Sequence, residues 1–393
     1  MRTIAVVTVG RSDYGLYLPI LRRLSGAPDV RCAVVAAGMH MSAEHGLTVK
    51  AIERDGFDIA ERVPLLADGD GPVAVAASIG RGVAGYAEAL DRVRPDILVV
   101  LGDRFDMYAA AVAALPLRIP VAHIHGGELT FGAIDDALRH SMTKLSHLHF
   151  VATREYGWRV EQMGEEPWRI TVSGAPGLDT IADVPPLQRP ALSEALGVDA
   201  ARPFLLATFH PVTLEHERTS WHVTELLAAL DEIGLPVVFT QANADTGGRV
   251  VRTMIEAFVA RTPVARLVNN LGTQAYLSAM GTAAAMVGNS SSGIIEAASF
   301  ALPVVNIGTR QDGRLRAANV IDVGYPRAEV RAGLRRALDP AFRASLDGLV
   351  NPYGDGHAAA RIVHRLVTEP LGAALLQKRF HDLPMPAPGE VSV

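Results

Sequence analysis

The sequence is poor in cysteine, in positive charge and in long apolar runs. Its single cysteine, Cys32, lies inside an apolar run, which excludes an internal disulfide and favours a buried, inert thiol. A formal net charge of −5 argues against a general nucleic-acid binder, which needs an excess of Lys and Arg. The apolar run at 4–9 is too short for a signal peptide, and no apolar stretch reaches membrane-spanning length. We therefore expect a cytoplasmic protein with no nucleic-acid or membrane partner.

Short apolar runs alternate with amphipathic segments of helical spacing along the whole chain. In the first half these runs lie at 3–9, 31–37, 97–101 and 120–124. In the second half they lie at 204–208, 236–240, 266–269, 285–288 and 303–307. This βαβ alternation predicts parallel sheets covered by helices. The expected fold class is α/β, with two Rossmann-like domains facing a cleft.

A stretch with three prolines, ADVPPLQRP at 182–190, has no hydrophobic periodicity and is typical of a linker. We therefore place an N-terminal domain at 1–184 and a C-terminal domain at 185–365. The remaining residues, 366–393, are expected to form a tail that packs back on the N-terminal domain.

Ligands bind at the carboxyl ends of the strands in open parallel sheets, so the residues that follow each apolar run are candidates. After the first run stands GRSDYG, at 10–15. Two glycines flank four residues, as in half a P-loop, but Leu16 and Tyr17 replace the Lys and Ser/Thr of that motif. A strand-to-helix turn that carries Arg11 suits an anionic ligand. A solvated turn is the alternative.

Carboxylates and histidines follow the next two runs. Asp103 directly follows the run at 97–101 and is either an acid/base group or a helix N-cap. The segment HIHGGE at 123–128 is followed by Asp135. Its His-x-His pair suggests a metal, but the third ligand would be a distant carboxylate, so we do not expect a metal site. Glu128 and Asp135 can converge with Asp103 on one substrate, and crowding raises the pKa of one carboxyl.

The second half carries a phosphate-type segment, GNSSSGIIE at 288–296. Small hydroxyl residues and free backbone N–H groups at the start of a helix expected at 294–300 form a phosphate site, and Glu296 can accept hydrogen bonds from ribose. A serine N-cap with a capping-box Glu is the alternative. His210 and Arg310 follow two further apolar runs. Together these residues predict a nucleotide-diphosphate site in the second domain and the chemistry in the first.

Ten segments, in this order along the chain, resemble the hydrolysing UDP-N-acetylglucosamine 2-epimerases of sialic-acid or legionaminic-acid biosynthesis, bacterial branch. They are GRSDYG, AGMHM, LGDRFDM, HIHGGE, IDDALRHSMTKLSHLHF, FHPVT, NADTG, GNSSSGIIEA, IGTRQDGR and NPYGDGHAAARIV. The resemblance implies a glycosyltransferase-B-like fold, a homodimer or homotetramer, a UDP-sugar substrate, and neither metal nor cofactor.

The resemblance also implies a mechanism. A base removes the proton on carbon 2, UDP leaves by anti-elimination to give a 2-acetamidoglucal, and water adds to release N-acetylmannosamine. The family's catalytic carboxylates match Asp103 and Asp135. In the animal-type branch a third catalytic carboxylate belongs to the segment HIEGGE. In this sequence His125 replaces the first Glu of that segment, and Glu128 matches the second. The third catalytic role therefore stays open between His125 and Glu128.

The remaining site residues carry over from the matching segments. His210 is assigned to both catalysis and binding. The substrate-binding set is Arg11, Tyr14, His40, Arg104, His210, Asn243, Ser290, Ser291, Ser292, Gly293, Glu296 and Arg310. Alternatives left open are a UDP-2,4-diacetamido-trideoxyhexose or GDP-sugar substrate, a non-hydrolysing 2-epimerase, a glycosyltransferase and a catalytically silent nucleotide-sugar sensor.

Overall fold

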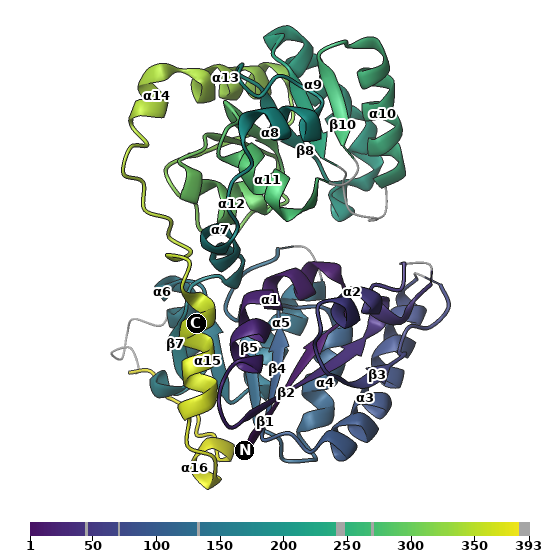
Figure 1. The fold of residues 1–393 in the computed structure, drawn as a ribbon, viewed down its shortest axis with the longest axis vertical. Coiled ribbons are helices and arrows are strands. Elements are labelled where there is room, and N and C mark those ends of the chain that lie inside the picture. Colours follow the sequence, from purple (N-terminus) through teal and green to yellow (C-terminus); the bar gives the residue numbers. More distant parts are fainter. Residues whose placement is uncertain (44–45, 70, 132–133, 241–247, 269–270, 385–393) are drawn as a thin grey trace, which may run out of the picture. The chain divides into compact units, whose positions relative to one another are not determined.

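The computed structural model describes residues 1–43, 46–69, 71–131, 134–240, 248–268 and 271–384. The chain forms two compact units (Figure 1). The first comprises residues 1–128, 134–179 and 354–393, and the second comprises 129–133 and 180–353. The sequence prediction set the boundaries at 184 and 365, so residues 354–365 lie in the first unit instead of the second.

The first unit is built on a parallel sheet of seven strands in the order β3-β2-β1-β4-β5-β6-β7. The strands are β1 Arg2–Thr8, β2 Val30–Ala37, β3 Ile59–Val63, β4 Ile97–Leu101, β5 Val121–Ile124, β6 Leu148–Val151 and β7 Ile170–Val172. Its helices are α1 Arg11–Ser25, α2 Val49–Arg54, α3 Pro72–Val93, α4 Phe105–Ala114, α5 Ile134–Leu145, α6 Arg154–Gln162, α15 Ala358–Thr368 and α16 Ala373–Leu376, with 3-10 turns Gly38–Met41, Pro167–Arg169 and Pro176–Leu178.

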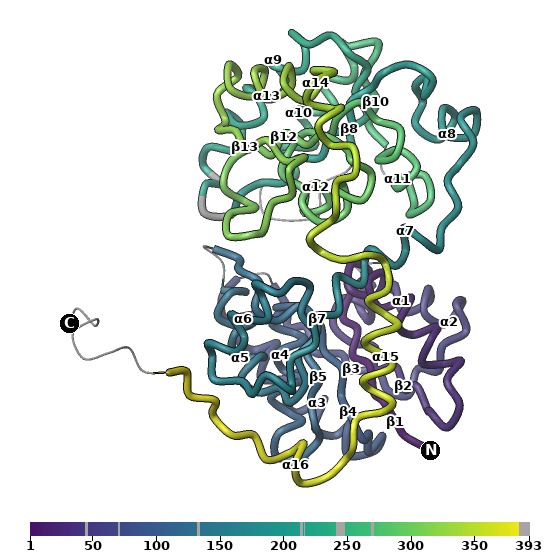
Figure 2. The backbone as a smooth tube through the Cα atoms, turned by 90° about the vertical axis from the view of Figure 1, so that its left-hand side faces the viewer, coloured from purple at the N-terminus to yellow at the C-terminus, as the bar shows by residue number. Residues whose placement is uncertain are grey.

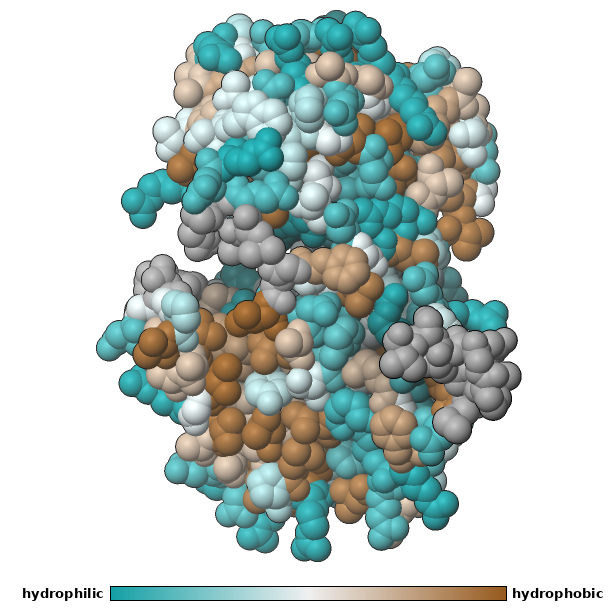
Figure 3. Space-filling model, turned by 180° about the vertical axis from the view of Figure 1, so that it is seen from behind, coloured by the Kyte–Doolittle hydropathy of each residue, from teal (hydrophilic) through white to brown (hydrophobic). Residues whose placement is uncertain are grey.

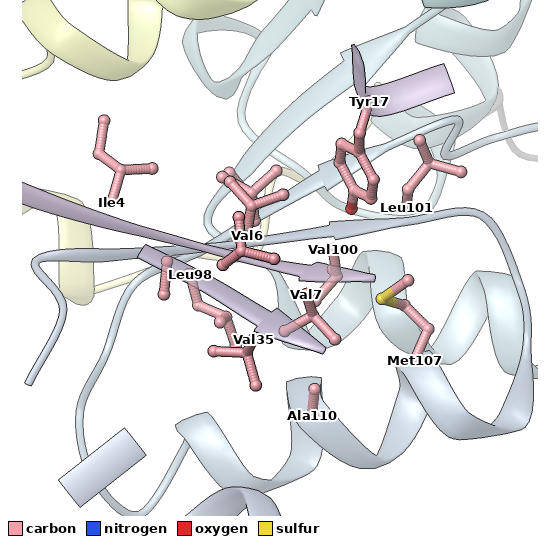
Figure 4. Packing of buried hydrophobic residues seen from close by; sticks show 14 of the residues in the cluster. Ile4, Val6, Val7, Tyr17, Val35, Leu98, Val100, Leu101, Met107 and Ala110 are labelled. Carbon is pink, nitrogen blue, oxygen red and sulfur yellow. The ribbon is translucent and has the colours of Figure 1, made fainter. Parts of the chain in front are cut away.

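Strand alternation explains how this sheet is covered on both faces. β1 and β4 are apolar on both sides, as expected for a buried parallel strand. Val7 and Leu98 point towards Ala110 of α4, whereas Ile4 and Val6 lie on the side of Tyr17 of α1 (Figure 4). All six residues are fully buried, so the centre of the sheet forms the rigid core of this unit.

The C-terminal helix α15 joins the same core. Ile362 and Leu366 recur at helical spacing, are fully buried and belong to the first unit's apolar cluster. Figures 1 and 2 show α15, in yellow, beside the purple α1, although more than 300 residues of chain separate them. Burial of this apolar stripe is the physical reason why residues 354–365 belong to the first unit.

The second unit has a parallel sheet of six strands in the order β10-β9-β8-β11-β12-β13. The strands are β8 Leu205–Thr208, β9 Val237–Thr240, β10 Ala265–Val268, β11 Ala285–Gly288, β12 Val304–Ile307 and β13 Val320–Val323. Its helices are α7 Asp179–Asp183, which starts at the boundary, α8 Arg189–Leu196, α9 Thr219–Ile233, α10 Gly248–Arg261, α11 Gly272–Met280, α12 Ser292–Ile295, α13 Arg327–Leu338 and α14 Pro340–Ala344, with 3-10 turns Thr213–Arg218 and Ala297–Phe300.

Both sheets have the doubly wound strand order, in which the chain reverses its direction of progress between two neighbouring strands. The reversal lies between β1 and β4 in the first unit and between β8 and β11 in the second. Loops diverge at the carboxyl ends of these strand pairs and leave a crevice there for a ligand. The fold therefore points to the segments after β1, β4, β8 and β11.

The surface adds less information than the interior. On the face seen in Figure 3, hydrophobic side chains form patches on the first unit among hydrophilic ones. Apolar atoms make up much of any folded protein's surface, so these patches identify no partner, and the expected oligomer stays a prediction. Within the described part of the chain, no helix has the length and apolar character that crossing a bilayer requires.

Candidate active site

Asp103 stands at the reversal point of the first unit. Gly102, which precedes it, has φ +80°, a conformation that favours glycine and turns the chain sharply out of β4. The imidazole Nε2–H of His123, in the neighbouring strand β5, donates to the carbonyl oxygen of Gly102 at 2.8 Å. The turn is therefore fixed from the adjacent strand, and Asp103 keeps 23% of its side chain exposed.

Arg139 of helix α5 joins the predicted site residues to one another. Its side chain is only 3% exposed. One guanidinium nitrogen forms an ion pair with the carboxylate of Asp103, and the other donates to the carbonyl oxygen of His125 at 2.7 Å. The second nitrogen also lies 3.9 Å from Oε2 of Glu128. A single buried cation thus holds three of the predicted groups in one cluster.

Sequence reasoning missed Arg139. The available signal was its spacing, because it lies four residues after Asp135 in the segment IDDALRH. Residues four apart in a helix lie on the same face, one turn from each other. An arginine one turn beyond a candidate catalytic carboxylate was therefore a candidate for the same site.

His125 and Glu128 form a hydrogen-bonded pair. The imidazole Nδ1–H donates to Oε1 of the Glu128 carboxylate at 2.6 Å. Both residues are buried, at 8% and 2% exposure. The turn between them requires Gly127, which has φ +76° and lies so close to the chain that a Cβ would stand 2.4 Å from the carbonyl oxygen of Tyr156. The residues that compete for the third catalytic role are therefore neighbours in space.

Asp135 opens helix α5 and is partly buried. Burial raises the pKa of its carboxyl, and the negative charge of Asp103 raises it further, while Arg104 and Arg139 act in the opposite direction. Crowded carboxyls with different environments can divide acid and base roles between them. The first unit thus places a carboxyl with a raised pKa near the arginine-paired Asp103.

Four predicted substrate residues of the first unit have different surroundings. Arg104 turns its guanidinium onto the buried Asp106, at 3.1 and 2.9 Å. Arg11 is exposed at the start of α1. The hydroxyl of Tyr14 donates to Asp55 at 2.6 Å. His40 has no exposed surface.

His40 belongs to a buried polar network with Asp13, which sequence reasoning did not single out. The Thr8 hydroxyl donates to the Asp13 carboxylate at 2.6 Å and lies 2.9 Å from Nε2 of His40. Nδ1 of His40 lies 2.7 Å from the hydroxyl of Thr48. Burial lowers the pKa of His40 to about 4 and raises that of Asp13 to about 6. In this structure a neutral His40 therefore holds the loop after β2, with both ring nitrogens bonded inside the protein.

Asn289 organises the reversal point of the second unit. Its side-chain oxygen accepts from the backbone N–H of His210 at 2.7 Å, and its side-chain nitrogen donates to the His210 carbonyl at 2.8 Å. This pair of hydrogen bonds ties the loop after β8 to the end of β11. Gly288 allows it, because with φ +130° a Cβ there would stand 1.9 Å from the Thr208 carbonyl oxygen. Sequence reasoning named both segments but not the two hydrogen bonds that join Asn289 to His210.

His210 and Arg310 both contact Asn289. Burial lowers the pKa of His210 to about 3, and the positive charge of Arg310 lowers it further. Arg310 donates to the backbone carbonyl of Asn289 at 3.1 Å. A neutral imidazole and a guanidinium therefore follow β8 and β12, the two strands that flank β11, and a guanidinium is suited to pair with phosphate.

The serine segment follows directly. Ser290, Ser291 and Ser292 are partly buried, and the Ser292 N–H donates to Oγ of Ser290 at 3.3 Å. Gly293 is closely packed, since a Cβ there would stand 2.9 Å from Val304. The helix expected at 294–300 is instead two short pieces, α12 Ser292–Ile295 and the 3-10 turn Ala297–Phe300, with Glu296 between them. Asn243 lies outside the described residues.

The alternative of a metal site finds no cluster to support it in the described residues. No group of three or more His, Cys, Asp or Glu side chains in residues 1–43, 46–69, 71–131, 134–240, 248–268 and 271–384 is placed to hold an ion. His123 already donates to the carbonyl oxygen of Gly102. Metal independence itself stays a prediction.

Similarity to known proteins agrees with this architecture. The UDP-GlcNAc 2-epimerase of Neisseria meningitidis, solved with UDP-GlcNAc bound, superimposes with a TM-score of 0.80 at 17% identity, over 94% of this chain and 100% of that one. At this identity the likeness concerns the fold alone. It confirms the predicted class of two parallel-sheet α/β domains of glycosyltransferase-B-like type.

Several proteins are more similar to this chain in sequence than that solved structure is. The UDP-N,N'-diacetylbacillosamine 2-epimerase (hydrolyzing) of Legionella pneumophila is 38% identical over 379 residues, covering 96% of this chain and 99% of the relative. The GDP/UDP-N,N'-diacetylbacillosamine 2-epimerase (hydrolyzing) of Campylobacter jejuni is 38% identical over 323 residues, covering 82% and 84%. The polysialic acid biosynthesis protein P7 of Escherichia coli is 30% identical over 387 residues, covering 98% of each.

The family model for UDP-N-acetylglucosamine 2-epimerase matches residues 22–367. This match spans most of the chain, and the relatives align over more than four fifths of their lengths. The chain therefore belongs to the UDP-N-acetylglucosamine 2-epimerase family.

Proposed function

We propose that this protein is a hydrolysing 2-epimerase whose substrate is a UDP-linked 2,4-diacetamido-2,4,6-trideoxyhexose, the class to which N,N'-diacetylbacillosamine belongs. The sequence analysis favoured UDP-N-acetylglucosamine and kept this sugar as an alternative. The preference changes because two hydrolysing diacetylbacillosamine epimerases are 38% identical to this chain, against 30% for the polysialic-acid relative. The products would be UDP and the sugar inverted at carbon 2.

The observation that carries the proposed chemistry is the cluster around Arg139. It gathers the carboxylate of Asp103 and the His125–Glu128 pair, and Asp135 adds a carboxyl whose pKa is raised. Inverting a carbon that bears a weakly acidic proton requires one group to remove that proton and another to return it. A protein that only bound nucleotide sugars would have no use for such a set facing an anionic ligand.

The proposed reaction proceeds in two balanced steps. A base takes the proton from carbon 2, the C–H electron pair becomes the C1–C2 double bond, and the C1–O bond breaks with its electrons leaving on UDP. Water then adds to carbon 1 and loses a proton to the protein, while carbon 2 receives a proton on the opposite face. Negative charge develops on the departing diphosphate, and the donors of the second unit around Ser290, Ser291, His210 and Arg310 would stabilise it.

Product analysis of a substrate panel tests this function. Purified protein is incubated separately with UDP-N,N'-diacetylbacillosamine, its GDP analogue, UDP-N-acetylglucosamine and a UDP-hexose without an acetamido group, and the products are identified by mass spectrometry. We expect free UDP and a released diacetamido sugar, with a kcat/KM for UDP-N,N'-diacetylbacillosamine at least about tenfold above that for UDP-N-acetylglucosamine, a difference of about 1.4 kcal/mol. A preference for UDP-N-acetylglucosamine would overturn the sugar assignment and leave the reaction class standing.

A further inference from the structure

His125 holds an unusual backbone conformation for a residue with a side chain. Its φ is +65°, in the left-handed region that residues other than glycine rarely occupy. Such strain persists only where the surroundings impose it, and it concentrates at functional sites. The contacts that impose this conformation on His125 therefore indicate the function of its side chain.

Three bonds fix this residue. Its backbone N–H donates to the carbonyl oxygen of Phe150 in β6 at 3.0 Å. Its carbonyl oxygen accepts from Arg139 at 2.7 Å. Its imidazole Nδ1–H donates to the Glu128 carboxylate at 2.6 Å. The main chain is anchored on both sides, so the orientation of the ring is set by Glu128.

This arrangement determines which nitrogen can react. A neutral imidazole has one N–H and one lone pair, and a hydrogen bond from Nδ1–H to a carboxylate leaves the lone pair on Nε2. Among the described residues Nε2 of His125 has no hydrogen-bond partner, and the side chain keeps 10% of its surface exposed. The available basic atom of the pair is therefore Nε2, and Arg139, which bonds the backbone carbonyl of His125, is also paired with Asp103.

We propose that Nε2 of His125 is the base that removes the proton from carbon 2 in the elimination step, and that Glu128 positions it. This inference rests on the proposed function. The proton moves from carbon 2 to Nε2, the C–H electron pair forms the C1–C2 bond, and UDP leaves with the C1–O pair. Imidazolium and carboxylate then face each other, so the charge formed on His125 is balanced within the pair.

Base strength assigns the imidazole to the elimination instead of the hydration. The carbon 2 proton is weakly acidic, and an ordinary imidazole, with a pKa of about 6.5, is a stronger base than an ordinary Asp carboxylate at about 3.9. Water that attacks an electron-poor carbon 1 needs a weaker base. The proton that returns to carbon 2 must come from the opposite face and hence from another group. Asp135 suits that role, because burial and the negative charge of Asp103 raise the pKa of its carboxyl.

Glu128 acts through His125 and so is a positioning residue. It is 2% exposed, its Oε1 accepts from the imidazole, and its Oε2 lies 3.9 Å from the Arg139 guanidinium. The cation balances the negative charge of this buried carboxylate, which would be unfavourable without a partner. Glu128 and His125 thus act as one unit.

His125→Gly is the decisive variant, because glycine adopts φ +65° without strain and leaves an imidazole-sized space beside Glu128. We expect kcat with UDP-N,N'-diacetylbacillosamine to fall at least about 100-fold. UDP affinity, measured by calorimetry, should change less than about threefold. Added imidazole should restore kcat at least about tenfold, increasingly as pH rises, since only its neutral form accepts a proton. Asp103→Asn, the matched control, should show no rescue.

Further variants keep the proposal falsifiable. Glu128→Gln should lower kcat less than His125→Gly and move the acidic limb of the pH profile to lower pH, because imidazolium loses the neighbouring negative charge. If His125→Gly does not fold, His125→Asn, which also tolerates the left-handed region, replaces it. A folded, UDP-binding His125→Gly that keeps more than a tenth of wild-type kcat, or that imidazole does not rescue, overturns the proposal. A wild-type protein inactive on the whole substrate panel would overturn the proposed function instead.

Discussion

At the scale of single residues, the first unit is organised around a buried cation. Arg139 reaches Asp103, the backbone of His125 and the neighbourhood of Glu128 from one position on α5. A buried arginine is stable only when its charge is balanced, so removing a partner affects the whole group. Variants in this cluster should therefore keep charge and size as close to the wild type as the question allows.

Asp103→Asn tests the catalytic cluster directly. The amide keeps the size of the carboxylate and an oxygen that can accept from Arg139, so we expect a folded protein. Turnover should fall by about 10²–10⁴, the range that acid/base roles supply. Circular dichroism checks the fold and UDP release measures the rate. A folded variant that retains more than about a tenth of the wild-type rate would rule out an essential role for Asp103.

Asp13 should make stability depend on pH. Burial raises the pKa of its carboxyl to about 6, above the ordinary value, so the folded protein binds this proton more tightly than the unfolded chain. The contribution is complete below about pH 4 and is lost as pH rises through about 6, by up to about 3 kcal/mol at about 1.4 kcal/mol per pKa unit. Asn in place of Asp13 keeps an acceptor for Thr8 and Val9 and removes the titration.

Urea unfolding of wild type and Asp13→Asn at pH 5 and pH 8 measures this effect. We expect the variant to gain stability relative to wild type as pH rises from 5 to 8. If the difference in unfolding free energy between the two proteins is the same at both pH values, Asp13 does not titrate in this range.

At the scale of elements, the strand ends at the two reversal points carry different chemistry. After β4 and β5 stand Asp103, His125 and Glu128, whereas after β8 and β11 stand His210, Asn289 and the serine segment. The first set can exchange protons, and the second presents donors and a nearby guanidinium. The proposed division assigns the sugar chemistry to the first unit and the nucleotide to the second.

UDP binding tests that division. Ser291→Ala and Arg310→Ala should each weaken UDP binding by about 1–3 kcal/mol, the loss expected for a charge-assisted hydrogen bond. Asp135→Asn should leave UDP affinity nearly unchanged. Isothermal titration of the three variants with UDP gives the comparison. Equal losses for Asp135→Asn and Arg310→Ala would refute the assignment of the nucleotide to the second unit.

Sequence reasoning found the central strands and missed those that carry polar residues. The runs at 97–101 and 285–288 match β4 and β11 to the residue, because both are apolar throughout and end in a glycine turn. The edge strands β3, β7 and β13 were missed, since an edge strand is half exposed and lacks a continuous apolar run. β6 was missed because the buried His149 interrupts it.

Sequence reasoning was also incomplete for the candidate active site. Segments that follow strands could be recognised one by one, but contacts between distant segments could not. Arg139 reaches Asp103 across 36 residues, and Asn289 reaches His210 across 79. Nor does the sequence show that His40 is fully buried or that His125 adopts a positive φ. Such properties depend on packing between segments, which no local pattern records.

At the scale of the whole molecule, the C-terminal tail is part of the first unit's structure. Lys378 forms an ion pair with the buried Glu165 at 2.7 Å, and Arg169 donates to the carbonyl of Leu375 at 2.8 Å. Burial alone would raise the pKa of Glu165. Hydrogen bonds from His149 and the two lysines, Lys144 and Lys378, instead lower it to about 2.

Lys378→Ala should therefore destabilise the protein by about 1.5–3 kcal/mol, because it removes a hydrogen bond to a buried charge. Arg252→Ala is the matched control, since its ion pair with Glu256 is about half exposed on both sides and should contribute less than about 1 kcal/mol. Urea unfolding monitored by circular dichroism gives both values. Equal effects of the two substitutions would show that the tail contact contributes no more than a surface pair.

The proposed reaction inverts carbon 2 and releases UDP. Following the conversion of UDP-N,N'-diacetylbacillosamine in D₂O by proton and phosphorus NMR tests it most directly. The account predicts that free UDP and free sugar appear in equal amounts, and that the sugar is inverted at carbon 2 and carries one deuterium there. A product still attached to UDP would show a non-hydrolysing epimerase. A released sugar with unchanged configuration and no deuterium at carbon 2 would show simple hydrolysis, and either result would contradict the account.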